Sequence, residues 1–257
     1  MKIFRNLLFL TLGLAVFISC SSDDDDKVIP EGEKSPVQVV LRSILNNEVE
    51  TFEAEGNPLS LEELYINIAE IEFEVADDME DILPGGDKLY TDVELEGPFP
   101  INLLSEKAQS GLTLSTTKVP NGTYDEIEFE LDVYKGEDEQ FKNLVGNTIY
   151  ASGSFDLGEN VIPFIIKSEE EMEVELEYEN SPLVLDGANT KVFIDLNLNK
   201  VVSELIKNAA TDFVGATKEE DGSILIDKNT NANILEKFEE ALESAFEAIE
   251  EAHEDNN

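Results

Sequence analysis

The sequence predicts a mainly β protein, an antiparallel β-sandwich over residues 36–200 followed by a helical C-terminal segment over residues 201–257 that packs on it. In the first range, short apolar runs alternate with acidic residues between Gly, Pro, Asn and Asp turn signals. Many short strands with one wet face favour a sandwich of two sheets. The chain has a single cysteine, so an apolar core rather than disulfides must stabilise this fold.

The individual strands are expected where apolar residues recur with a period of two. This alternation predicts strands at residues 37–41, 65–75, 126–133, 172–178 and 194–198. Within residues 65–75 the parity of the apolar residues changes. One extra residue near Ala69 and Glu70 would return them all to one face, so we expect a β-bulge there.

Beyond residue 200 the apolar residues follow helical spacing. One helix is expected from Val201 to about residue 213, and a longer one begins near Asn233. The longer helix carries an apolar stripe that includes Phe238 and Phe246. This stripe must be buried, either against an open face of the sandwich or in the groove of a partner.

The N-terminus predicts a secreted, lipid-anchored protein. Lys2 and Arg5 precede an apolar run too short to span a bilayer, as in a signal peptide over residues 1–19. The cleavage region that ends at Cys20 resembles a bacterial lipoprotein signal, in which the cysteine becomes the lipidated N-terminus. Such a modification would attach the protein to a membrane through its acyl chains.

An acidic tether over residues 20–35 follows the predicted lipidation site. Its first residues resemble the export signal of Bacteroidota lipoproteins that reach the outer face of the outer membrane: Ser21, Ser22, Asp23, Asp24, Asp25 and Asp26. We therefore expect an outer-membrane protein that faces the cell exterior. A periplasm-facing accessory lipoprotein is the alternative.

Charge excludes one class of partner. The chain has 58 acidic and 17 basic residues and a formal net charge of -41, which repels nucleic acid phosphates. The same charge should hold the domain away from an anionic membrane surface. Excess acid that simply keeps a secreted protein soluble is an equally good explanation.

The alternating acids suggest a cation site. Glu128, Glu130 and Asp132 lie on one expected strand, and Glu173, Glu175 and Glu177 lie on another. If the two strands are neighbours, like charges face each other at an energetic cost, which a bound Ca²⁺ would relieve. If they are not, the acids point into solvent, and no cofactor is needed.

No enzymatic activity is expected from the sequence. The only histidine, His253, lies near a chain end that cannot hold it in a cleft, which argues against nucleophilic catalysis and His-based metal sites. A carboxylate-dependent glycan hydrolase is the alternative, because some pair of the many acids could reach the required separation. The leading expectation is a binding, adhesion or assembly module with a glycan or protein ligand.

The stretch from Val119 to Phe129, with its Pro120-Asn121-Gly122-Thr123-Tyr124 turn, resembles the domain-of-unknown-function family 4382. Residues 101–104, 162–164 and 192–196 sit where further segments of that family fall. The resemblance implies an antiparallel sandwich of an immunoglobulin- or prealbumin-like kind and no established activity or catalytic residues. The turn also has a physical explanation, since Pro120 presets φ and Asn121-Gly122 tolerates positive φ.

Overall fold

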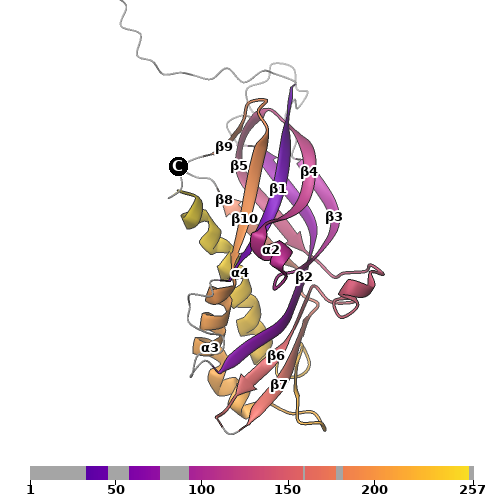
Figure 1. Ribbon diagram of the computed structural model, residues 1–257, viewed down its shortest axis with the longest axis vertical. Helices are drawn as coiled ribbons and strands as arrows, with labels where there is room; N and C mark the ends of the chain where they lie inside the picture. Colours follow the sequence, from indigo (N-terminus) through magenta and orange to yellow (C-terminus); the bar gives the residue numbers. More distant parts are fainter. Residues whose placement is uncertain (1–32, 46–57, 76–92, 159, 178–181, 255–257) are drawn as a thin grey trace, which may run out of the picture.

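The computed structural model describes residues 33–45, 58–75, 93–158, 160–177 and 182–254. Cys20, the export residues and the predicted signal peptide lie outside the described residues. The first described strand, β1, begins at Lys34, so the last two residues of the predicted tether are part of the folded domain. The protein is mainly β, as the alternation predicts, with two helices near its C-terminus (Figure 1).

The larger sheet is built around one long strand, β2. Its order is β11-β7-β6-β2-β5-β8, with β3 paired to β2 and β9 paired to β5. One part of β2 pairs with β6 and the remainder pairs with β5, so β2 joins two halves of the sheet. The strands span β2 Leu59–Val75, β3 Val93–Asn102, β5 Gly122–Leu131, β6 Ile149–Asp156, β7 Val161–Ser168, β8 Met172–Glu177, β9 Leu183–Leu185 and β11 Ile224–Ile226.

The smaller sheet has the order β10-β1-β4, with bounds β1 Lys34–Ile44, β4 Leu112–Pro120 and β10 Thr190–Asn197. β1 and β4 are antiparallel, but β1 and β10 are parallel. β11 and β7 form a second parallel pair. The expectation of purely antiparallel sheets is therefore wrong for these two pairs, because each joins strands far apart in the chain, which no hairpin connects.

The predicted β-bulge in β2 is confirmed. The register shifts between Ile68 and Glu70 in the pairing with both β3 and β5. As a result Ile66, Ile68 and Ile71 are all fully buried on the core side. The backbone of β3 comes close at this point, because a Cβ at Gly97 would lie 2.7 Å from the carbonyl oxygen of Ile68.

Two helices pack along the sheets. α3 (Leu198–Gly215) begins three residues earlier than expected, with the Asn197 side chain accepting a hydrogen bond from the Lys200 N–H. Its Phe213 stacks on Phe155 of β6 with ring centroids 4.6 Å apart. α4 (Ala232–Glu254) packs against α3, β7, β8, β10 and β11. Of the described helices, none combines the length and apolarity that crossing a membrane requires.

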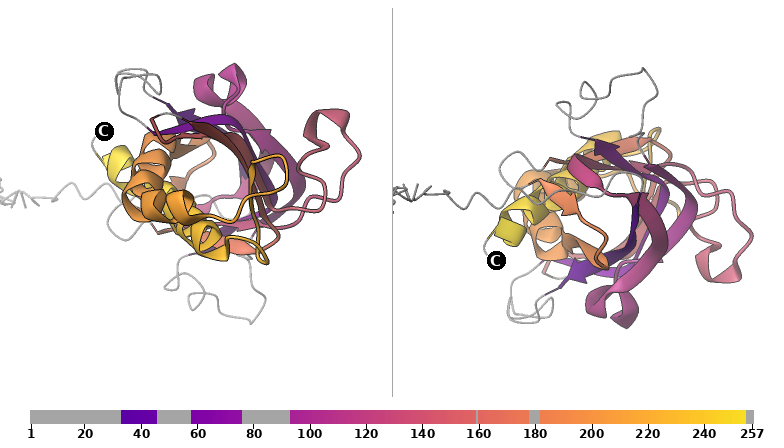
Figure 2. Two further views of the ribbon diagram at one scale, coloured as in Figure 1. Left: turned by 90° about the horizontal axis from the view of Figure 1, so that it is seen from below. Right: turned by 90° about the horizontal axis from the view of Figure 1, so that it is seen from above.

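The two sheets curl around a common core and meet along two seams (Figure 2). Along one seam α4 packs against β8 of the larger sheet and β10 of the smaller one. The other seam lies between β3 and β4, which pair with β2 and β1 respectively and not with each other. A short helix, α2 (Glu106–Ser110), connects these two strands at one end of the seam.

The turn before β5 is held by buried side chains rather than by positive φ angles. Neither Asn121 nor Gly122 is among the described residues with positive φ, so the expectation for these two residues is wrong. The Asn121 side chain is instead buried and accepts a hydrogen bond from Ser35 Oγ at 2.7 Å. Tyr124 Oη donates to the Pro120 carbonyl at 2.9 Å. Side-chain hydrogen bonds therefore explain this motif.

Candidate functional site

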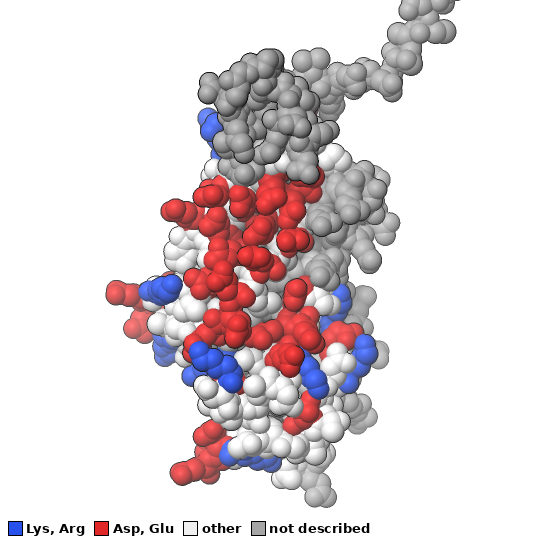
Figure 3. Space-filling view, turned by 180° about the vertical axis from the view of Figure 1, so that it is seen from behind, with Lys and Arg blue, Asp and Glu red and all other residues white. Residues whose placement is uncertain are grey.

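Glutamates of four strands form a continuous acidic face on the outer side of the larger sheet (Figure 3). They alternate with core residues, so every second side chain of each strand points outward. The acidic face consists of Glu94 and Glu96 of β3, Glu70, Glu72 and Glu74 of β2, Glu126, Glu128 and Glu130 of β5, and Glu173 and Glu175 of β8; Glu177 of β8 lies opposite Glu126 in the backbone register.

The register places these glutamates in rows across the strands. One row runs Glu96, Glu70, Glu130, Glu173, the next runs Glu94, Glu72, Glu128, Glu175, and the third runs Glu74, Glu126, Glu177. Like charges directly opposite each other destabilise a sheet, typically by a few tenths of a kcal/mol up to about 1 kcal/mol per pair. The acidic face is therefore a cost to the fold, which the partial solvent exposure of its glutamates reduces.

The sequence left open whether β5 and β8 are neighbours, and the structure shows that they are. Glu128 lies opposite Glu175, and Glu130 lies opposite Glu173. Asp132 follows the last paired residue of β5 and takes no part in these rows. Its carboxylate accepts a hydrogen bond from the Val133 N–H and lies 3.6 Å from Lys135 Nζ.

Sequence reasoning missed the acids of β2 and β3. Carboxylate oxygens of Glu72, Glu74 and Glu128 lie within 4.8 Å of one another, as do those of Glu70, Glu72 and Glu94. Of the six acids predicted as cation ligands, only Glu128 belongs to either group. The signal was present in β2, where Glu70, Glu72 and Glu74 alternate with apolar residues just as the acids of β5 do.

Two glutamates in the middle of the acidic face have raised pKa values. Partial burial raises the pKa of Glu128, and the neighbouring Glu173, Glu74 and Glu175 raise it further. Burial likewise raises the pKa of Glu130, with repulsion from Glu171 and Glu70 as the next causes. These carboxyls therefore hold protons more tightly in the folded protein than in the unfolded chain.

The connection between β5 and β6 covers another part of the outer face. Its residues Tyr134, Phe141 and Leu144 form a second apolar cluster with Tyr65 of β2 and Tyr150 of β6. Tyr65 stacks on Tyr150 and contacts Phe141 edge-on, with centroids 6.0 and 5.9 Å apart. Here sequence reasoning found no site, because the covering residues lie between two strands and show no period of their own.

Comparison with known families identifies the domain. Residues 53–213, more than half of the chain, match the model of the family described as Domain of unknown function (DUF4382). The chain belongs to this family. No curated protein and no solved structure matches this chain.

The DUF4382 region contains all strands of the acidic face, but three elements of the fold lie outside this region. β1 precedes the matched residues, while β11 and α4 follow them. The helix that closes one seam between the sheets therefore comes from outside the matched region. The predicted resemblance to this family is confirmed, over a range that starts after β1 and extends through most of α3.

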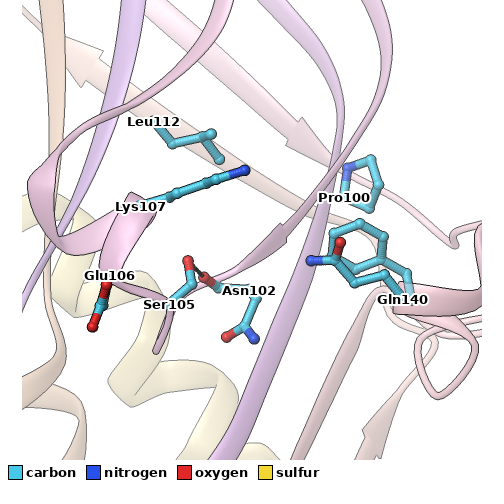
Figure 4. Close-up of a pocket in the computed structure, with 8 residues that line it drawn as sticks. Pro100, Asn102, Ser105, Glu106, Lys107, Leu112 and Gln140 are labelled. Atoms are coloured by element: carbon cyan, nitrogen blue, oxygen red, sulfur yellow. Dashed lines mark hydrogen bonds between the residues drawn. The ribbon is translucent and has the colours of Figure 1, made fainter.

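A hollow of about 460 Å³ lies at the α2 end of the open seam in this DUF4382 domain (Figure 4). Its lining comes from β3, α2, the start of β4 and the β5–β6 connection: Pro100, Asn102, Ser105, Glu106, Lys107, Leu112, Gln140 and Phe141. Glu106 is the one carboxylic acid in this lining. The hydrolase alternative requires two convergent carboxylates, and this hollow does not provide them.

Proposed function

We propose that this protein is a non-enzymatic lipoprotein of the outer-membrane surface whose β domain serves as a binding, adhesion or assembly module. Lipid on Cys20 would provide the membrane attachment, and the acidic residues that follow it would direct the protein to the cell exterior. A glycan or a protein is the expected ligand. A periplasm-facing accessory lipoprotein is the alternative on the same anchor.

The acidic face carries the proposal. Its rows of opposed glutamates cost folding free energy, and a surface that opposes folding is where a functional role is expected. The face repels anionic headgroups, so it favours an orientation in which it points away from the membrane. A domain held in this way presents its remaining surfaces to partners in solution or on other cells.

Metabolic labelling with a fatty-acid probe tests the anchor. The full-length protein should incorporate the probe, and Cys20→Ala should abolish labelling and release the protein from membranes. Ser22→Ala is the matched control and should be labelled normally. An unlabelled wild-type protein that remains with the membrane would refute the lipoprotein assignment.

Protease treatment of intact cells tests the side of the membrane. Digestion of the wild-type protein, while a periplasmic marker stays intact, supports surface display. Full protection until the outer membrane is permeabilised supports the periplasm-facing alternative. Replacing Asp23 to Asp26 by Asn should convert the first result into the second if these residues direct export.

Calcium is the cation proposed for the acidic face. The close carboxylates of Glu72, Glu74 and Glu128 supply the oxygen ligands that Ca²⁺ prefers. Calorimetric titration of the full-length protein should then give a saturable heat with calcium, and Glu128→Gln should weaken it. Absence of heat together with an unchanged melting temperature would remove calcium from the proposal.

For the fold, we propose the sandwich that the sequence predicted, immunoglobulin- or prealbumin-like. The two sheets around one core support it, as does the Tyr124–Pro120 hydrogen bond, since a tyrosine bonded to backbone a few residues upstream is common in Greek-key sandwiches. The parallel β1–β10 and β7–β11 pairs are additions to that plan.

A further inference from the structure

The free edge of β4 is the one long sheet edge that the described part of the molecule leaves unprotected. β9 and β11 have three residues each, and α4 packs against β8 and β10. Pro98 and Pro100 interrupt β3, and prolines on an edge prevent further pairing. β4 has nine residues, none of them acidic, in a chain with 58 acids.

The register shows which backbone groups of β4 face the open seam. The Asn121 N–H donates to the Glu33 carbonyl at 2.8 Å, and hydrogen-bonded pairs alternate along an antiparallel ladder, so the pair three residues further along, Pro36 with Lys118, is not hydrogen-bonded. The N–H and C=O of Lys118 consequently point away from β1, toward the seam. The same holds for Thr116, which lies two residues earlier and opposite Gln38. Before Ser115 the β1–β4 register shifts, so regular pairing is limited to the later residues.

The seam also offers apolar side chains and a cation. Leu95 and Phe99 of β3 and Leu112 and Leu114 of β4 pack against the core but remain partly exposed. In the hollow, the Lys107 side chain extends between Leu112 and Asn102, whereas the Glu106 carboxylate points away (Figure 4). Among the described residues, no carboxylate forms an ion pair with Lys107.

We propose that the open seam binds an extended segment of a partner protein, which adds as a strand to β4 and places a carboxylate on Lys107. Backbone hydrogen bonds to Thr116 and Lys118 would supply affinity, and the hollow would supply specificity. The segment carries apolar side chains at alternate positions, toward Leu112, Leu114 and Phe99. An antiparallel orientation brings its C-terminal end to the hollow.

The carboxylate follows from charge complementarity. Lys107 precedes an acid-free strand that itself contains Lys118, so this is a local site for an anion on a protein whose net charge is -41. At 0.1 M salt, exposed charges more than about 10 Å away are largely screened, so Lys107 and Lys118 determine the electrostatic attraction for a ligand in the seam. The carboxylate can be a chain terminus or an Asp side chain. Both sources share the same chemistry at Lys107.

Synthetic peptides test the seam. The probe is a short peptide of alternating valine and threonine in three forms: with a free C-terminal carboxylate, with a C-terminal amide, and with a final Asp before an amide. Binding is measured by fluorescence anisotropy against the full-length lipoprotein in detergent. We expect the amide form to bind about tenfold more weakly than the better of the two carboxylate forms. The carboxylate form that binds more tightly shows whether the carboxylate is a chain terminus or an Asp side chain.

Variants of the protein show where the peptide binds. Thr116→Pro removes an N–H that faces the seam but keeps the β1 pairing, so it should abolish binding. Lys107→Met, on the exposed side of α2, should make the amide and carboxylate forms bind equally, whereas Lys191→Met on β10 should change nothing. Lys107→Met remains informative if Thr116→Pro does not fold.

Three results would overturn the proposal: no binding of any form, binding that folded Thr116→Pro retains, or equal affinity of all three forms for the wild type. Self-association of the wild type that Thr116→Pro removes would also overturn it, by assigning the edge to a second copy of the chain. The inference deepens the proposed function and rests on it. Failure of fatty-acid labelling would refute the anchor without affecting peptide binding, so the two can fail separately.

Discussion

The outer face of the larger sheet has two parts that treat carboxylates in opposite ways, and β2 runs through both. In the covered part, Glu63 accepts hydrogen bonds from Tyr65 Oη, Asn143 Nδ2 and Ser152 Oγ at 3.1, 3.4 and 3.2 Å. In the acidic face, Glu72 lies between Glu94 and Glu128. Glu63 thus accepts three side-chain hydrogen bonds, whereas Glu72 lies in a row of glutamates.

The difference shows what decides whether an acid helps or opposes this fold. A partly buried carboxylate must find hydrogen-bond donors, because leaving it without them costs a large desolvation penalty. The carboxylates of the acidic face are half-buried or exposed, so water and salt still reach them and weaken the repulsion between opposed pairs. Along β2, the acid beneath the β5–β6 connection is therefore hydrogen-bonded, whereas the acids beyond that connection lie in rows of glutamates.

The largest effect is expected from the covered part. Tyr65→Ala removes the centre of the second apolar cluster and should lower the free energy of unfolding by about 3 kcal/mol. Glu72→Ala, on the same strand and the same face, should change it by less than about 1 kcal/mol. Urea denaturation followed by circular dichroism measures both. Similar losses for the two variants would contradict the division of this face.

Replacing glutamate by glutamine should change the free energy of unfolding in opposite directions in the two parts of the face. Glu63→Gln replaces an ionised carboxylate, which accepts three hydrogen bonds, by a neutral amide. It should lower the free energy of unfolding by about 1 kcal/mol. The triple change Glu72→Gln, Glu128→Gln and Glu175→Gln neutralises most of one row and should stabilise by about 1 kcal/mol at low salt.

Salt sharpens this contrast. Raising the ionic strength to about 1 M shortens the screening length to about 3 Å and should remove most of the advantage of the triple variant over the wild type. Glu106→Gln, outside both parts, is the control for a simple change of net charge. An equal gain from Glu106→Gln would attribute the effect to overall charge rather than to the rows.

The smallest effect concerns pH. The pKa values of Glu128 and Glu130 are raised in the folded state above the ordinary value of 4.5, so the folded protein binds more protons than the unfolded chain between these values. Their contribution to stability therefore increases as the pH falls through the raised pKa values, and levels off below the ordinary one. Melting temperatures from about pH 7 to about pH 5 should rise for the wild type and rise less for Glu128→Gln with Glu130→Gln. A steady fall would contradict the assigned direction.

The predictable parts of the fold were those with a strict local period. The alternation in β5 and β8 and the parity change in β2 each have one physical explanation, and the bulge at Ile68–Glu70 follows from it. The parallel pairing of β1 with β10 joins residues more than 150 positions apart, for example Arg42 with Asp195, and no local pattern encodes it.

The acidic face was only half visible from the sequence for the same reason. Alternation identifies which residues of a strand point outward, but not which strands are neighbours. The strand order added Glu70, Glu72, Glu74 and the two glutamates of β3, and it left Asp132 outside. The hollow beside Lys107 had no sequence signal, because its lining comes from four separate elements.

The smaller sheet depends on distant parts of the chain, since β1 pairs with β10, and the helix α4 that closes one seam follows both of them. Contacts of this kind form only after a long loop has closed, which slows folding. The domain is therefore expected to fold as one slow cooperative unit, with β1 joining the smaller sheet no earlier than β10.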